Sequence, residues 1–125
     1  GITTLAESIQ ELNKINRFVE IPMSGSLCDL VWSDPVQDDT GSTHSQNPLI
    51  PNYQRNCSIF FGADHARNFL KREKLITIIR AHEVQLEGYK QHYWPKWKEI
   101  PMVYTLFSAP NYCGSYGNLG AILTI

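Results

Sequence analysis

Apolar residues recur at helical spacing in the first segment of the chain. Four of them lie four, three and three positions apart, which places them on one stripe of a helix. They are Leu5, Ile9, Leu12 and Ile15. Thr4 and Glu7 have the spacing of a capping box, in which two side chains satisfy backbone N–H groups of the first turn. We therefore expect an amphipathic helix that begins near Thr4 and packs through this stripe.

A polar segment follows a short apolar run. Residues 27–32 are too few for their spacing to distinguish a helix from a strand. The next residues, Ser33-Asp34-Pro35, predict an extended or turn conformation, because the residue before a proline avoids helical backbone angles. Residues 34–54 contain three prolines and almost no apolar pattern. They form either a flexible linker or a long surface loop within one domain, and both interpretations remain open here.

The pattern after Arg55 predicts alternating strands and helices. Residues 57–61 indicate a strand, residues 63–74 a helix, and residues 75–79 a second strand. The second strand is β-branched and nearly all apolar, as expected of a strand buried on both faces. These three elements together predict a βαβ-like unit.

Two later apolar runs, residues 102–107 and 119–125, predict a pair of strands joined by the loop at residues 108–118. Between the two parts, residues 88–101 hold tyrosines and tryptophans among lysines. Such interleaving can bind nucleic acid, but the stretch is short and includes an acidic residue. A hairpin or edge loop is the favoured interpretation.

Composition limits the chain to one domain or a piece of one, since 125 residues are too few for two cores. Eleven basic and twelve acidic residues give a net charge of −1, so net charge predicts neither a nucleic-acid nor a membrane partner. A content of 42% hydrophobic and 18% charged residues is typical of a globular protein. The three cysteines have no paired spacing, which favours a reducing compartment, the cytoplasm or the nucleus. No apolar stretch reaches the roughly 18 residues that span a bilayer.

His82 is the first candidate for chemistry. It follows the predicted strand at residues 75–79 by three positions, and functional groups of α/β folds gather where buried strands end. A neutral imidazole suits zinc or iron, although spacing alone favours a hydrogen-bonded structural histidine. The comparison of His82-Glu83 with a zincin motif fails, because position 86 is a leucine. The other histidines, His44, His65 and His92, are interpreted as structural or solvent-exposed.

Arg55 is a second candidate, at the entrance to the predicted strand at residues 57–61. A guanidinium group at a strand edge is a planar fork for a phosphate or carboxylate. An ordinary surface arginine is the commoner alternative. The loop at residues 108–114 carries a tyrosine and a thiol near its tip, but its composition identifies no ligand. The residues alone thus predict part of an α/β domain, without a complete catalytic or binding site.

Four motifs, in order and at matching spacing, resemble the C-terminal half of the phosphoprotein phosphatase family of serine/threonine phosphatases. They are Leu27–Pro35 (Leu-Cys-Asp-Leu-Val-Trp-Ser-Asp-Pro), Arg55-x-Cys57-Ser58-x-Phe60-x-Gly62, Ile79–Glu83 followed by Glu87-Gly88-Tyr89, and Leu106–Cys113. The opening residues are most similar to calcineurin, whereas the loop at Cys113 is more similar to type 1, 2A and 5 phosphatases. The subfamily therefore stays open.

The resemblance implies a fold, an activity and a cofactor. The fold is α/β (α+β), the C-terminal part of a calcineurin-like metallophosphoesterase with a central β-sandwich flanked by helices. Residues 1–125 are then half of one catalytic domain, with residues 34–54 as an internal loop. The implied reaction is hydrolysis of phosphoserine and phosphothreonine in proteins by two metal ions, iron with zinc, or manganese. The implied partners are phosphoproteins and regulatory subunits or domains, without nucleic acid or membrane.

The resemblance also assigns residues. His82 matches a metal-ligating histidine, and Arg55 and Tyr112 match residues that bind the substrate phosphate. Two further residues, Trp32 and Asp34, match positions near the pocket and along an acidic groove. Cys113 lies in the loop that resembles the family's site for toxin inhibitors.

Two departures from the family pattern bear on function. Asn56 stands where the family usually has glycine, which puts the presentation of the neighbouring arginine in doubt. The motifs that supply the general acid and most metal ligands belong to the family's N-terminal half and are absent from these residues. We therefore expect no catalytic general acid within the segment and no activity from the segment alone. The alternative is a non-catalytic pseudophosphatase that acts as a scaffold or binding module.

Overall fold

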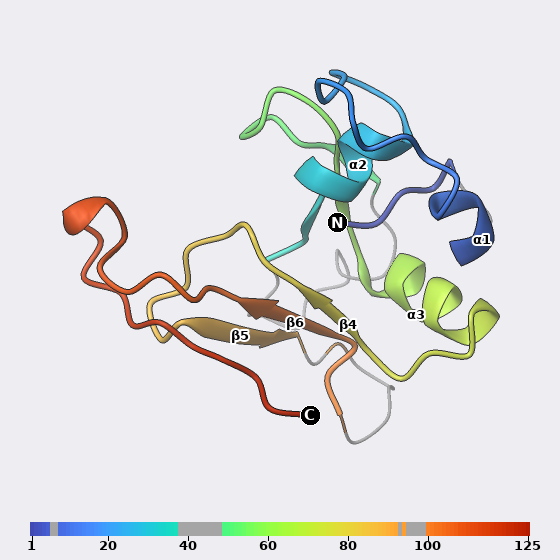
Figure 1. Ribbon diagram of the computed structural model, residues 1–125. Helices are drawn as coiled ribbons and strands as arrows, with labels where there is room; N and C mark the ends of the chain where they lie inside the picture. Colours follow the sequence, from blue (N-terminus) through green and yellow to red (C-terminus); the bar gives the residue numbers. More distant parts are fainter. Residues whose placement is uncertain (6–7, 38–48, 93, 95–99) are drawn as a thin grey trace. The chain divides into compact units, whose positions relative to one another are not determined.

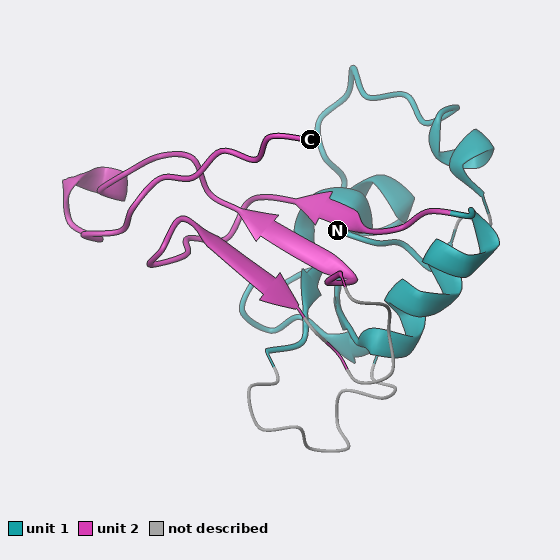
Figure 2. Cartoon of the chain, turned by 90° about the horizontal axis from the view of Figure 1, so that it is seen from below, with its two compact units in different colours: residues 1–74 teal, residues 75–125 magenta. Residues whose placement is uncertain are grey.

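The computed structural model describes residues 1–5, 8–37, 49–92, 94 and 100–125, and the description below refers to these residues. The chain divides into two compact units, residues 1–74 and residues 75–125 (Figure 2). Each unit contains one three-stranded sheet, and strands β4, β5 and β6 of the second unit are labelled in Figure 1. The two units are described separately.

The sheet of the first unit has the strand order β1-β3-β2. Its central strand, β3 (Ile59–Phe61), pairs in parallel with β1 (Asp34–Pro35) and antiparallel with β2 (Ile50–Pro51). The predicted strand at residues 57–61 is therefore confirmed in its second half, and the extended conformation at Asp34–Pro35 is confirmed. Both ends of the polar segment 34–54 pair with the same strand, while its residues 38–48 lie outside the described part of the chain.

Two longer helices of this unit lie at apolar segments of the sequence. The run that was too short to assign forms helix α2 (Ser26–Trp32), which buries Cys28 and Asp29. Helix α3 (Ala63–Arg72) is confirmed within two residues of its predicted end, and it buries Ala66 and Leu70. Its single acidic residue, Asp64, lies in the first turn and two of its basic residues, Lys71 and Arg72, lie in the last turn, as the helix dipole favours.

The prediction for the first helix is wrong in its length. Helix α1 spans only Ile9–Leu12, and its N-cap is Ser8, whose hydroxyl accepts a hydrogen bond from Glu11 N at 3.3 Å. No residue of α1 is fully buried. A one-turn helix has too few hydrogen bonds to persist on apolar spacing alone, so the local cap decides where it begins. The predicted capping partner Glu7 lies outside the described residues.

The sheet of the second unit has the order β4-β6-β5. Strand β6 (Val103–Leu106) is central and confirms the predicted strand at residues 102–107. It pairs in parallel with β4 (Ile78–Arg80) and antiparallel with β5 (Tyr89–His92). Residues 89–92 of the segment predicted as a hairpin or edge loop thus form a strand at the edge of the sheet. The side chains of Val103 and Thr105 are both fully buried, because alternate residues of a strand face the same side.

Three predictions for this region are wrong. The strand predicted at residues 75–79 begins three residues later, and Ile76 and Ile79 are 62% and 45% exposed, so the strand is not buried on both faces. Strands β3 and β4 belong to different sheets, which excludes the βαβ-like unit. Residues 119–125 form no strand, although backbone hydrogen bonds from Leu119 N to Leu86 O (2.8 Å) and from Ala121 N to Phe107 O (3.1 Å) fix their path. The apolar composition predicts a strand there, but no described strand pairs with these residues.

None of the described helices is long and apolar enough to cross a membrane. All three cysteines are free thiols: Cys28 is buried, Cys57 is partly buried and Cys113 is exposed.

Candidate functional site

Arg55 lies in the tight loop that joins β2 to β3. The loop is closed by a backbone hydrogen bond from Asn52 N to Ser58 O (3.0 Å) and by a turn bond from Arg55 N to Asn52 O (3.2 Å). Two residues of the loop, Asn56 and Ser58, have positive φ angles of 56° and 61°. Asparagine tolerates this left-handed conformation better than other residues except glycine. The substitution of Asn56 for the family's usual glycine is therefore compatible with the loop.

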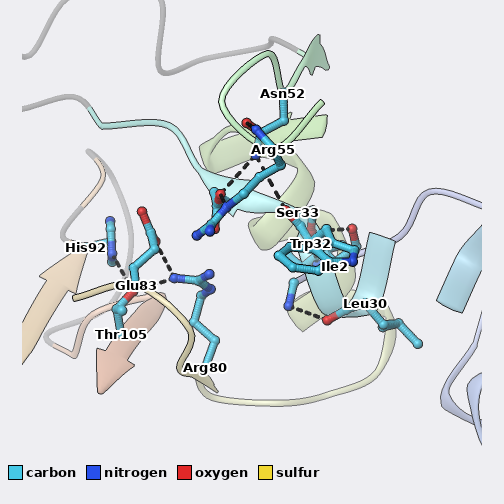
Figure 3. Close-up of polar contacts among 12 residues, drawn as sticks. Ile2, Leu30, Trp32, Ser33, Asn52, Arg55, Arg80, Glu83, His92 and Thr105 are labelled. Atoms are coloured by element: carbon cyan, nitrogen blue, oxygen red, sulfur yellow. Dashed lines mark hydrogen bonds and ion pairs between the residues drawn. The ribbon is translucent and has the colours of Figure 1, made fainter. Parts of the chain in front are cut away.

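The side chain of Arg55 is held by an ion pair and by an aromatic ring (Figure 3). Its Nε donates to Asp34 Oδ2 at 2.9 Å, and the Asp34 side chain is only 2% exposed. The guanidinium carbon lies 5.7 Å from the centre of the Trp32 ring, within range of a cation–π contact. Trp32 and Asp34, predicted near a pocket and an acidic groove, thus both contact Arg55, and the Asp34 carboxylate is buried.

His82 follows β4 in a short turn with a positive φ of 78°, an uncommon angle for a residue with a side chain. The turn is held by an ion pair between Arg80 Nη1 and Glu83 Oε2. Arg80 is the last residue of β4, so the turn begins directly where the strand ends.

Tyr112 lies in the loop after β6. Because β4 and β6 are parallel, their carboxyl ends meet at one edge of the sheet. His82 and Tyr112 accordingly line the same cavity of about 610 Å³, together with Ser108 and Phe107. Tyr112 packs edge-on against Phe107, with ring centres 5.1 Å apart. The structure therefore brings together two of the predicted site residues from segments thirty residues apart.

One residue that holds the Tyr112 loop has no signal in the sequence motifs. Asn118 is buried, and its Oδ1 accepts from Tyr112 N (2.9 Å) while its Nδ2 donates to Ala109 O (2.9 Å). The neighbouring Cys113 is exposed at the tip, with a positive φ of 55°. The loop is held by side-chain-to-backbone hydrogen bonds, which composition alone does not indicate.

A polar network joins Arg80, Glu83, Thr105 and His92 (Figure 3). Besides Glu83, Arg80 Nη1 donates to Thr105 Oγ1 at 3.1 Å. The same hydroxyl lies 3.1 Å from His92 Nε2. Thr105 is fully buried and His92 is 5% exposed, which agrees with the interpretation of His92 as structural. The network ties β4, β5 and β6 together at the site.

The described residues do not form a metal centre by themselves. No group of three or more histidine, cysteine, aspartate or glutamate side chains in this part of the chain is placed to hold a metal ion. His82, on the wall of the 610 Å³ cavity, is the candidate ligand that these residues offer. His65 lies on helix α3, and His44 falls among the residues that are not described. A metal ion here requires further ligands.

Comparison with known proteins identifies the class. Residues 2–86 match the family model of the calcineurin-like phosphoesterases, and the chain belongs to this family. This confirms the predicted fold class.

The particular relatives are serine/threonine phosphatases. The chain is 42% identical over 129 residues to the serine/threonine-protein phosphatase 2B catalytic subunit A1 of Saccharomyces cerevisiae, covering 98% of this chain and 23% of the relative. Subunit A2 of the same organism is 38% identical over 146 residues, covering 98% and 24%. A solved Saccharomyces cerevisiae serine/threonine phosphatase, described as similar to human phosphatase PP5, superposes with a TM-score of 0.73 at 32% identity, over 96% of this chain and 33% of that one. The chain thus spans about a quarter of the length of the curated relatives it matches.

Proposed function

We propose that this chain forms the C-terminal half of the catalytic domain of a metal-dependent phosphatase that hydrolyses phosphoserine and phosphothreonine in proteins. The observation that carries the proposal is the shared cavity of His82 and Tyr112 at the carboxyl edge of β4 and β6, in a chain of this family. Its substrates would be phosphoproteins, and regulatory subunits or domains would be its partners.

Each candidate residue has a distinct role in this proposal. His82 would bind one of two metal ions, which would be iron with zinc, or manganese. The other metal ligands and the general acid of the reaction would lie outside this segment. A bound metal pair supplies activation of water and neutralisation of charge on the phosphoryl group. Arg55, held by Asp34 and Trp32, would bind phosphoryl oxygens through its planar fork. Tyr112 would line the phosphate pocket, and the exposed Cys113 would belong to an inhibitor-binding loop.

A non-catalytic scaffold is the alternative. Two features favour it: the absence of the N-terminal motifs from these residues, and Asn56, whose replacement of the family's usual glycine puts the presentation of Arg55 in doubt. Asn56 adopts a left-handed angle that asparagine tolerates, and the ion pair of Arg55 with Asp34 is intact. The catalytic proposal is therefore the better supported of the two.

The test compares variants of the complete catalytic polypeptide that carries this segment. His82→Ala should lose bound metal and nearly all turnover of a phosphopeptide. Arg55→Ala should keep its metal content and lose on the order of 10²-fold in kcat/KM, as expected when a preorganised charged donor is removed. Arg72→Ala, at an exposed arginine on helix α3, is the matched control and should leave turnover unchanged.

The isolated segment should bind metal weakly and show no turnover, because one imidazole cannot hold two metal ions. Metal analysis and phosphopeptide assays on the segment measure both properties. Two equivalents of tightly bound metal with turnover would contradict the proposed division of the site, and full turnover by His82→Ala would contradict the role of the histidine.

A further inference from the structure

The side chain of Asn52, in the Arg55 loop, makes three hydrogen bonds, and no sequence motif draws attention to it. It begins the loop after β2 and is only 2% exposed. Its Nδ2 donates to Asp34 Oδ2 at 2.9 Å and to the carbonyl oxygen of Trp32 at 3.4 Å. Its Oδ1 accepts from the backbone N–H of Arg55 at 3.2 Å. All three partners of this side chain are therefore Arg55 itself or residues that contact its guanidinium group (Figure 3).

We propose that Asn52 is a positioning residue for Arg55: its carboxamide fixes the Asp34 carboxylate that holds the guanidinium group and, at the same time, the backbone from which that side chain extends. This inference rests on the proposed phosphatase function, in which Arg55 binds the phosphoryl group. It adds Asn52 as a residue that affects phosphate binding only through the position of the Arg55 side chain.

The geometry explains why such a residue matters. One carboxylate oxygen, Asp34 Oδ2, accepts both from Arg55 Nε and from Asn52 Nδ2, each at 2.9 Å. A carboxylate held from two sides cannot rotate freely, so the direction in which it holds the arginine is fixed. An arginine side chain has many rotamers, and this conformational freedom is lost on binding if the side chain is not already ordered. Ordering before substrate binds therefore raises the affinity for the phosphoryl group.

A purely structural role for Asn52 would have a different contact pattern. The loop is already closed by backbone bonds from Asn52 N to Ser58 O and from Arg55 N to Asn52 O, which need no side chain at position 52. The carboxamide adds bonds directed at the surroundings of the arginine. By contrast, Ser58 in the same loop donates its hydroxyl to Asp29 Oδ1 at 2.8 Å, away from Arg55.

The experiment uses the full-length protein and five variants: Asn52→Asp, Asn52→Ala, Arg55→Ala, the Asn52→Asp/Arg55→Ala double variant and Ser58→Ala. Both Asn52 variants remove the donor to Asp34. Asn52→Asp keeps the side-chain volume and the acceptor but adds a negative charge beside the Asp34 carboxylate, whereas Asn52→Ala adds no charge and should show a loss of the same order. We expect kcat/KM to fall roughly 10- to 100-fold, as for misplacement of a catalytic group. We also expect the inhibition constant for inorganic phosphate to rise about 10-fold, in proportion to lost phosphate affinity. Ser58→Ala loses one hydrogen bond of the loop and should stay within about 2-fold of the wild type in both.

The double variant separates positioning from general structure. If Asn52 acts through Arg55, Asn52→Asp should change kcat/KM less than about 2-fold once Arg55 is already alanine. An equal loss in both backgrounds overturns the proposal, as does wild-type kcat/KM in Asn52→Asp. If Asn52→Asp does not fold, Asn52→Ala takes its place in the same cycle.

A measurement without turnover keeps this inference separate from the proposed function. Hydrogen exchange of the Arg55 Nε–H, followed by NMR, should be at least about 10-fold faster in Asn52→Asp than in the wild type. Equal exchange overturns the positioning role whatever the activity. Conversely, unchanged phosphate inhibition in Arg55→Ala would refute the proposed role of the arginine, a result that is obtained without any Asn52 variant.

Discussion

Replacement of Thr105 by valine tests the polar network that joins this residue to Arg80 and His92. Valine has nearly the same shape as threonine but lacks the hydroxyl, so the variant removes one polar atom from a fully buried position. That hydroxyl accepts from Arg80 Nη1 and pairs with His92 Nε2, each at 3.1 Å. We expect the variant to be folded and clearly less stable.

The loss can be estimated from these two contacts. A hydrogen bond from a charged group contributes about 1.5–3 kcal/mol, and one between neutral groups contributes about 1 kcal/mol. The additional buried methyl group offsets about 0.8 kcal/mol. The free energy of unfolding of the second unit should therefore fall by about 2–3 kcal/mol. Arg80 keeps its ion pair with Glu83, so the His82 turn should remain attached to its own strand.

Urea unfolding, followed by a signal from residues 75–125, measures this difference. Thr77→Val is the matched control: its hydroxyl donates to the carbonyl oxygens of Pro101 (2.9 Å) and Met102 (3.3 Å), which are neutral acceptors. The control should lose only about 1 kcal/mol. If Thr105→Val unfolds within about 0.5 kcal/mol of the wild type, or if the two variants are equal, the charged network is not what stabilises this sheet.

Two further predictions concern local conformation and pH. A Cβ atom on Gly88, which has a φ of +78°, would lie 2.7 Å from Ala121 N, whereas Gly117, with a φ of +62°, has nothing within 4 Å. Gly117→Ala should therefore cost about 1 kcal/mol for its left-handed angle, and Gly88→Ala about 1–3 kcal/mol more for the clash; equal melting temperatures would contradict this. Burial, reinforced by the neighbouring Cys57 thiol, raises the pKa of Cys28 from 9.0 to about 11. Because the neutral thiol is favoured in the folded state, stability is full below about pH 9 and falls by up to about 3 kcal/mol as the pH rises towards 11. Urea unfolding under reducing conditions should show this alkaline loss in the wild type and not in Cys28→Val; parallel pH profiles would refute it.

The sequence predicted elements well where their stabilising contacts are local. Helix α3 has ten residues with a regular apolar stripe, and both its type and its N-terminal end were predictable. The predicted length of helix α1 was wrong because apolar residues continue at helical spacing beyond the four residues that form the helix. The pairing of β4 with β6 rather than with β3 depends on contacts between distant residues, which no local pattern contains. The predicted βαβ-like unit was wrong for that reason.

The candidate site residues were predictable from the sequence, but the residues that hold their loops in place were not. Arg55, His82 and Tyr112 were named from motifs, and the cavity shared by His82 and Tyr112 agrees with that choice. Asn52 and Asn118 were missed, although each fixes a loop that carries a candidate residue. Both are ordinary polar residues in the sequence. Their roles depend on burial and on bond directions that appear only when the chain has folded.

Backbone angles give an argument for these loops that does not depend on any resemblance. Among the described residues, six positions other than glycine have a positive φ. Five of them lie in the three loops that carry Arg55, His82 and Tyr112, and these five are Asn56, Ser58, His82, Asn111 and Cys113. For residues other than asparagine, here Ser58, His82 and Cys113, such angles cost on the order of 1–3 kcal/mol each and persist only where the surrounding structure enforces them. Here the Asn52 and Asn118 side chains and the Arg80–Glu83 ion pair provide that enforcement. The concentration of unfavourable backbone at these three loops, and its near absence elsewhere in the described chain, is therefore the pattern expected when a fold gives up stability to hold functional side chains in place.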